Sequence, residues 1–197
     1  TMQLPGGKSV TFESNNRSKK SVTLDLKKEK GRQVLHRLVE KCDVFLTSFH
    51  RVVKEYQVDY ENLSKYNSRL VYALVTPWGL NGPDKDKAGY DPQALARSGI
   101  ADVLGDPPVL AQYAMVDAVT AILASHAVVS ALLARERYGK GQMVTVSLLS
   151  AGITLAYGNV ASALLTGRDV VRHDRARTTN PLRNLYKCAD GRWIMGA

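Results

Sequence analysis

Asp117 is the residue of this chain whose type and surroundings best suit covalent chemistry. It opens an apolar segment, residues 116–138, built mostly from small and aliphatic side chains, whereas the other acids are mostly scattered or lie beside basic residues. The segment predicts one long helix that ends at Gly139. Free backbone N–H groups and the helix dipole favour an ionised carboxylate at a helix N-terminus. Asp117 is therefore either a helix cap or a nucleophile.

The elements ahead of Asp117 indicate an α/β fold. Residues 21–26 alternate between apolar and polar side chains as a half-buried strand does, and residues 44–46 and 69–75 are typical of buried strands. Residues 28–42 and 59–66 have the pattern of helices. Alternating strands and helices predict a parallel sheet with right-handed crossovers, which is a Rossmann-like arrangement.

The remaining segments differ in regularity. Residues 78–113 are rich in Gly, Pro and Asp without a sustained period, and loops of this length are usually functional. An apolar run at 143–148 leads into a second helix that extends to about residue 165. Residues 185–197 predict a hairpin with a tight turn.

Composition narrows the classes of function. The formal net charge is +9, but no nucleic-acid reader motif or pattern of stacking aromatic side chains accompanies it. His126, Ser130 and Arg135 interrupt the longest apolar stretch, so no membrane span is expected. The two cysteines fit a reducing cytoplasm, and the histidines and cysteines lack metal-ligand spacing. A basic structural or binding fragment stays open as an alternative to an enzyme.

A series of short motifs carries a resemblance to a known family. The motifs are NRSKKSVTLDL (16–26), DVFLTSF (43–49), RLVYALV (69–75), WGLNGP (78–83), GYD (89–91), Asp117 with its helix, YGKGQ (138–142) and YKCADGRW (186–193). In this order and spacing they resemble the class III CoA-transferases of the CaiB/BaiF type, which include formyl-CoA transferase and carnitine CoA-transferase. Each motif is weak alone, but the ordered set is specific.

The resemblance implies an architecture. Residues 1–165 would be part of a Rossmann-like large domain that binds CoA, and residues 166–197 a linker and the start of a small domain. Such proteins are about twice the length of this chain, and their two identical subunits interlock as rings. We therefore expect a cytoplasmic homodimer of a longer protein, with the Rossmann-like sheet segment followed by long helices.

The resemblance also implies a reaction. Asp117 would attack an acyl-CoA thioester to give a mixed anhydride, and CoA thiolate would convert this into an aspartyl-CoA thioester. A carboxylic acid acceptor would then take the CoA through a second anhydride. No permanently bound cofactor or metal is expected, because coenzyme A enters as the acyl-CoA substrate. An apolar environment suits this chemistry, since water would hydrolyse the anhydride.

The same resemblance assigns substrate-binding residues. Those expected to contact CoA or substrate are Leu24, Leu26, Lys27, Ser48, Phe49, His50, Arg51 and Tyr90. Lys27 is suited to a phosphate. Ser48 to Val52 stands where the family usually has Asn-Phe-Arg-Pro-Gly, so the basic group is shifted by one place here.

Tyr90 distinguishes transfer from a second activity. In the related α-methylacyl-CoA racemases a histidine at this position works with the aspartate as an acid–base pair. A neutral tyrosine, with an ordinary pKa of about 10, is poorly suited to remove a proton next to a thioester. Transfer is therefore favoured, and an acyl-CoA racemase or isomerase remains the alternative.

Overall fold

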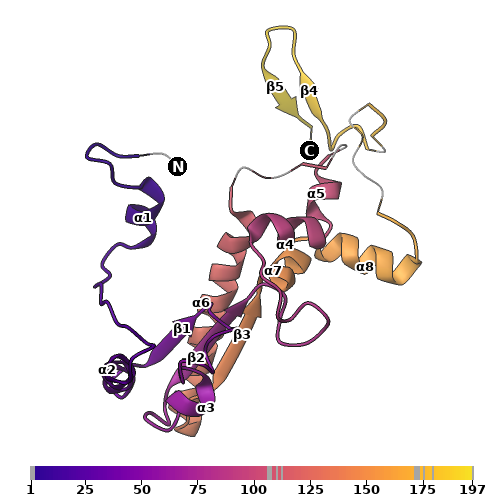
Figure 1. The fold of residues 1–197 in the computed structure, drawn as a ribbon. Helices are drawn as coiled ribbons and strands as arrows, with labels where there is room; N and C mark the ends of the chain where they lie inside the picture. Colours follow the sequence, from indigo (N-terminus) through magenta and orange to yellow (C-terminus); the bar gives the residue numbers. More distant parts are fainter. Residues whose placement is uncertain are drawn as a thin grey trace.

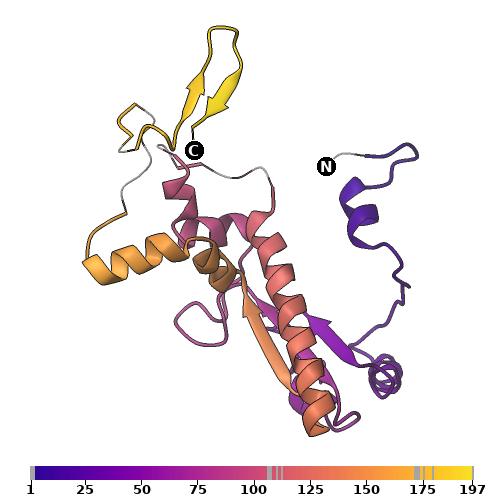
Figure 2. The same cartoon turned by 180° about the vertical axis from the view of Figure 1, so that it is seen from behind.

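The computed structural model of the chain describes residues 3–105, 108, 109, 111, 113–170, 174, 176–178 and 180–196. Three parallel strands form its main sheet, with helices packed around them (Figure 1). α1 (Val10–Asn15) lies apart from this sheet, and so does the C-terminal hairpin (Figures 1 and 2).

The parallel sheet places β2 between its two neighbours. Its strands are β1 (Val44–Thr47), β2 (Val71–Thr76) and β3 (Met143–Ser147). Val71 pairs with Val44, and Tyr72 pairs with Met143. β2 is buried over nearly its whole length, as a continuous apolar run in a parallel sheet requires. The α/β class predicted from the sequence is confirmed.

Residues 21–26 do not form the predicted strand. Residues 21–25 have no regular secondary structure, Leu26 begins a turn, and none of the six pairs with a strand in the described part of the chain; Val22 is 64% exposed. Leu26 alone packs against the sheet core, and its carbonyl accepts a hydrogen bond from Arg32 Nη1 at 2.9 Å. An alternating pattern shows which side chains can share a face, but a strand also needs a neighbour to pair with.

The two predicted helices of this half are present but shorter than expected. α2 spans Glu29–Val39, and α3 spans only Tyr60–Leu63. Asp59 caps α3, because its side chain accepts the backbone N–H of Asn62 at 3.2 Å. α3 forms the crossover between β1 and β2, so the βαβ connection predicted here is confirmed.

The segment 78–113 contains two short helices that the sequence pattern did not reveal. They are α4 (Asp91–Arg97) and α5 (Ile100–Val103). Gln93 starts α4 by accepting the backbone N–H of Tyr90 at 2.8 Å through Oε1. A helix of one or two turns is too short to show a sustained period. The sequence pattern therefore indicated a loop throughout this segment.

The long helix predicted around Asp117 is α6, Met115–Tyr138. It ends as expected at Gly139, whose φ of +75° few other residues tolerate. Arg135 joins the end of α6 to the sheet through a 2.9 Å ion pair from Nη2 to Asp43.

The interruptions in the apolar pattern of α6 do not exclude a membrane span, because this helix is long and apolar enough to cross a membrane. The expectation that no segment spans a membrane is not tested by this finding and stays a prediction. In the structure α6 packs along β2, β3 and α7, which is also how a core helix lies (Figure 2).

The second helix predicted after β3 is in fact two helices. α7 (Leu148–Leu155) and α8 (Tyr157–Thr166) meet at an angle of 79°. The predicted hairpin is confirmed: β4 (Leu185–Lys187) pairs antiparallel with β5 (Trp193–Met195).

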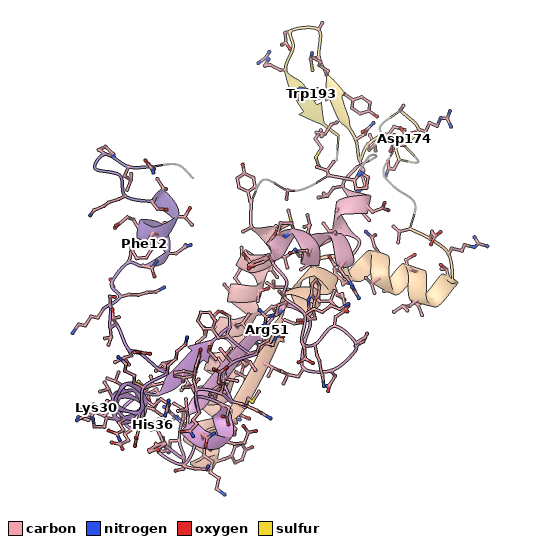
Figure 3. The ribbon with its side chains drawn as sticks, in the orientation of Figure 1. Phe12, Lys30, His36, Arg51, Asp174 and Trp193 are labelled. Atoms are coloured by element: carbon pink, nitrogen blue, oxygen red, sulfur yellow. The ribbon has the colours of Figure 1, made fainter. Side chains whose placement is uncertain are left out.

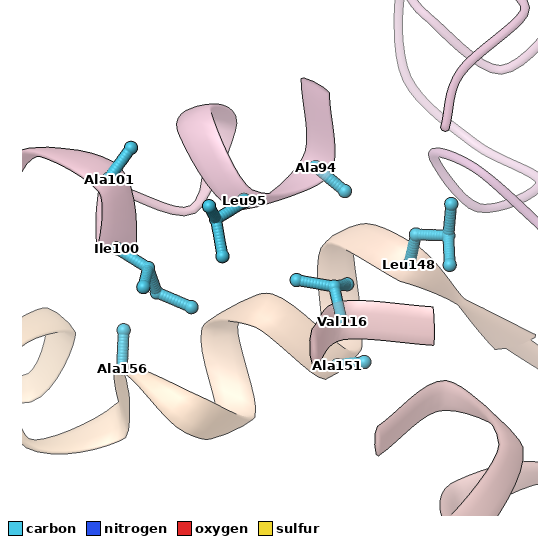
Figure 4. Packing of buried hydrophobic residues seen from close by; sticks show 8 residues of the cluster. All are labelled: Ala94, Leu95, Ile100, Ala101, Val116, Leu148, Ala151 and Ala156. Carbon is cyan, nitrogen blue, oxygen red and sulfur yellow. The ribbon is translucent and has the colours of Figure 1, made fainter. Parts of the chain in front are cut away.

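Buried side chains form two separate clusters. The sheet cluster comprises Val39, Val53, Val58, Leu63, Leu70, Tyr72 and Leu74. The helical cluster comprises Ala94, Leu95, Ile100, Ala101, Val116, Leu148, Ala151 and Ala156, from α4 to α7 and the turn after α7 (Figure 4). Asp117 follows directly after a member of the helical cluster.

We expect Tyr72→Phe to destabilise the sheet cluster by about 1 kcal/mol, because it removes one buried hydrogen bond. The Tyr72 hydroxyl donates to the Val58 carbonyl at 2.9 Å, and Tyr72 is 1% exposed. Urea unfolding would measure the loss as a lower midpoint. Tyr138→Phe is the matched control, since Tyr138 is 77% exposed. Equal midpoints for Tyr72→Phe and the unsubstituted protein would contradict this account.

Candidate functional site

All three parallel strands end at a buried hydroxyl residue. The Oγ1 atom of Thr47 accepts the N–H of Phe49 at 3.2 Å, and that of Thr76 accepts the N–H of Gly79 at 2.9 Å. Ser147 Oγ accepts the N–H of Ser150 at 3.0 Å and so caps α7. These bonds turn each chain away from its strand at the same edge of the sheet. The carboxyl edge of a parallel sheet is where ligands bind in open α/β folds.

A pocket of about 370 Å³ lies at this edge. Its lining comes from the segment after β1, the end of β2, the segment before α4, the first turn of α6 and the start of α7. The lining residues are Ser48, Phe49, His50, Arg51, Val52, Val75, Thr76, Pro77, Ala88, Gly89, Tyr90, Asp117 and Leu148. The structure thus brings together six of the nine residues predicted for the site. Figure 3 labels Arg51 at this end of the sheet.

The other three predicted residues do not line this pocket. Leu26 lines an adjoining apolar pocket that also includes Ser48 and Phe49. Leu24 is half-buried, and Lys27 is exposed. Because residues 21–26 form no strand, nothing in the sheet register directs Leu24 and Lys27 toward Asp117.

Asp117 is the third residue of α6, and the helix holds it at the pocket through its neighbour. Val116 is fully buried in the helical cluster, packed among α4, α5 and α7. Asp117, by contrast, lies exposed at the rim, with only part of its side chain shielded from solvent. Val116 therefore fixes the first turn of α6 in the protein interior while Asp117 meets the pocket.

The pKa of Asp117 is raised above its ordinary value, which reverses the expected direction. Partial burial is the larger cause, and the negative charge of Asp91 adds to it. The position at a helix start, which favours ionisation, does not prevail over these two effects. The carboxyl is thus more basic than that of an ordinary aspartate.

The sequence suggested that Asp117 is isolated from other acids, but in the structure Asp91 contacts it. The backbone N–H of Asp117 donates to Asp91 Oδ2 at 2.9 Å. Asp91 is the first residue of α4 and is 7% exposed. The motif GYD contains Asp91, but sequence separation hid the contact. Its one local signal was an acid directly before Pro92, at the start of a helix.

The pocket carries groups suited to a phosphorylated, partly aromatic ligand. Phe49 and Tyr90 are 74% and 70% exposed, so their rings are available for contact. Arg51 supplies a guanidinium, and Nε2 of His50 is buried without a hydrogen-bond partner among the residues that the structure describes. Within the described ranges, no three His, Cys, Asp or Glu side chains gather as a metal site would require.

The site combines an aspartate of raised pKa with a pocket at the carboxyl edge of a parallel sheet. These two features define the protein as an α/β protein with an enzyme-like crevice. The model of CoA-transferase family III matches residues 1–197, and the chain belongs to this family.

Similar proteins support this assignment. The chain is 32% identical over 188 residues to the succinate–glutarate CoA-transferase of Agrobacterium fabrum, covering 93% of this chain and 47% of that protein. It is 31% identical to the succinyl-CoA:glutarate CoA-transferase of Mus musculus, covering 96% and 44%. A CaiB/BaiF family protein from Brucella suis has a similar crystal structure, with a TM-score of 0.86, 30% identity, and coverage of 98% of this chain and 52% of that one. The chain spans about half the length of these relatives.

Proposed function

We propose that the protein containing this chain transfers coenzyme A from an acyl-CoA thioester to a carboxylic acid, with Asp117 as the covalent nucleophile. The observation that carries the proposal is the position of Asp117, whose carboxyl has a raised pKa and borders the pocket at the carboxyl edge of the sheet. Membership of CoA-transferase family III supplies the reaction class.

Each step of the proposed reaction exchanges one acyl bond for another. A carboxylate oxygen of Asp117 attacks the thioester carbon, the C–S bond breaks, and CoA thiolate leaves behind a mixed anhydride. The thiolate attacks the Asp117 carbonyl carbon and expels the donor carboxylate, giving an aspartyl-CoA thioester. The acceptor carboxylate displaces the thiolate to form a second anhydride. The thiolate then attacks the acceptor acyl carbon, which releases the new thioester and regenerates Asp117.

The pocket supports this sequence in two ways. The higher basicity of Asp117 strengthens it as a nucleophile, as Brønsted behaviour predicts. The apolar side chains beside it, Val75 and Leu148, limit access of water to the anhydride. We assign Arg51 and His50 to phosphate groups of CoA and Phe49 to its base; the assignment is supported by the position of all three in the pocket lining.

Transfer is a better account than the two alternatives. Tyr90, not a histidine, lines the pocket with Asp117, so the acid–base pair expected of a racemase is missing at this position. A role in binding nucleic acid would leave the pocket and the carboxyl of Asp117 without use. The relatives named above are CoA-transferases.

We extend the proposal to the setting of the protein. We propose a cytoplasmic location, which the two free cysteines, Cys42 and Cys188, fit. We propose a homodimer on the ground of the family resemblance alone. The acceptor is proposed as a carboxylic acid, the class to which the glutarate in the names of two similar proteins belongs.

The test is covalent trapping in the full-length protein. Incubation with an acyl-CoA, reduction with borohydride or reaction with hydroxylamine, and peptide mapping by mass spectrometry should locate a modification on Asp117. Asp117→Asn should give none. A modification on Asp91 instead, or none on protein shown to bind CoA, would refute the assignment of Asp117.

A further inference from the structure

The first turn of α6 lacks a local cap. The N-cap residue is Ala114, whose side chain has no hydrogen-bond acceptor. The first N–H groups of a helix have no partner within the helix, so they need acceptors from elsewhere. Asp117 occupies the third helical position, where an acidic side chain commonly folds back onto the cap residue.

Asp91 supplies the missing acceptor from another helix. Its Oδ2 accepts the N–H of Asp117 at 2.9 Å across 26 residues of sequence. With Asp91 93% buried, this bond lies largely away from competing water. Asp91 therefore caps α6 in place of Asp117, whose own carboxylate stays available at the pocket.

The charge of Asp91 acts on the same carboxyl. The other groups facing Asp117 come from several segments: His50 and Arg51 after β1, Tyr90 before α4, and Leu148 from α7. Among these described groups together with Asp91, Asp91 is the one acid that faces Asp117. Arg51 carries the opposite charge, but it is exposed to solvent, which weakens its effect on the Asp117 carboxyl. The negative charge of Asp91 disfavours ionisation of the Asp117 carboxyl and so raises its pKa.

We propose that Asp91 is a positioning residue for the nucleophile: it fixes the backbone of Asp117 through its N–H and holds a negative charge beside the attacking carboxylate. The proposal rests on the proposed function of Asp117. It assigns Asp91 no contact with substrate.

Two substitutions separate the two effects. Asp91→Asn keeps an oxygen that can accept the N–H but removes the charge, whereas Asp91→Ala removes both. For Asp91→Asn we expect kcat/KM to fall by roughly tenfold or less at neutral pH, and the acid limb of its pH profile to move to lower pH. For Asp91→Ala we expect a loss on the order of 100-fold, since the nucleophile is no longer held in place.

Asp86→Asn is the matched control. Asp86 lies in the same segment, is exposed and does not line the pocket, so this variant removes one negative charge without touching the contact. Its pH profile should equal that of the unsubstituted protein. An acid limb that stays in place in Asp91→Asn, or that moves equally in Asp86→Asn, would overturn the proposal.

Amide hydrogen exchange provides a readout that does not depend on activity. The Asp117 N–H should exchange faster in Asp91→Ala than in Asp91→Asn, and unchanged exchange in Asp91→Ala would also overturn the proposal. Absence of a trapped adduct in the unsubstituted protein would instead refute the function of Asp117. The two failures are therefore distinguishable.

Discussion

Replacing Asp117 with asparagine is expected to abolish CoA transfer, with a loss on the order of 10⁴-fold or more in kcat, because no covalent intermediate can form. The side chain keeps its size, so the pocket and the contact from the Asp117 N–H to Asp91 should persist. Steady-state transfer between an acyl-CoA and a carboxylic acid measures the loss. Substantial activity in Asp117→Asn would contradict the nucleophile assignment.

The same substitution should stabilise the fold at neutral pH. The pKa of Asp117 is raised in the folded state, first by burial and then by Asp91, so the folded protein favours the protonated form. The stabilisation of that form is fully present below the ordinary aspartate pKa and is lost as pH rises through the raised value. Asparagine stays neutral at all these pH values, so Asp117→Asn avoids this loss of folding stability at neutral pH.

Thermal unfolding at several pH values checks the sign. The melting temperature of Asp117→Asn should exceed that of the unsubstituted protein at pH 7, and the difference should shrink as pH falls below the ordinary aspartate pKa. A lower melting temperature at neutral pH would show that the carboxylate stabilises the fold and would contradict the raised pKa.

Gly141→Ala is expected to destabilise the protein by about 3 kcal/mol, at the upper end of the usual cost of overpacking. A Cβ at Gly141 would lie 2.1 Å from the carbonyl oxygen of Leu70 and 2.5 Å from the carbonyl carbon of Arg69. The Gly141 N–H donates to the Ser68 carbonyl at 2.9 Å, so the connection before β3 lies directly against the connection before β2. The Leu70 oxygen and the Arg69 carbon are backbone atoms, so neither can move aside as the end of a flexible side chain would.

Gly139→Asn is the matched substitution in the same turn. Gly139 has a φ of +75° with no atom within 4 Å of its ideal Cβ position, and asparagine tolerates that conformation better than most residues. We expect a cost below about 1 kcal/mol. Urea unfolding of both variants measures the difference, and equal midpoints would show that the close approach at Gly141 is relieved without cost.

Local periodicity was enough to predict the elements whose environment the sequence itself specifies. The apolar run of β2 has to be buried on both faces, and the 24 residues of α6 end at a glycine in the left-handed region. Both were predicted correctly. Residues 21–26 show the limit, because pairing depends on a neighbouring strand and not on the alternating pattern alone.

Site residues could be predicted from the sequence where one short segment directly follows a strand. They were harder to predict where the packing of separate helices determines which side chains meet. Ser48 to Arg51 follow β1 directly, so their position at the carboxyl edge comes from the order of elements. The contact of Asp91 with Asp117 depends on how α4 and α6 pack, and a motif search shows no such geometry. Leu24 and Lys27 were assigned by resemblance, and without a strand at 21–26 they do not reach the pocket.

Chain segments connected to both hydrophobic clusters line the pocket. Asp117 is joined to the helical cluster through Val116, whereas the segment that carries Ser48 to Arg51 leads to Val53 and Val58 of the sheet cluster. The proposed nucleophile and the proposed phosphate-binding groups are therefore connected to different hydrophobic clusters. A ligand that contacts both Asp117 and the segment after β1 would therefore link the two clusters, and its binding would add a contact between them at this edge of the sheet.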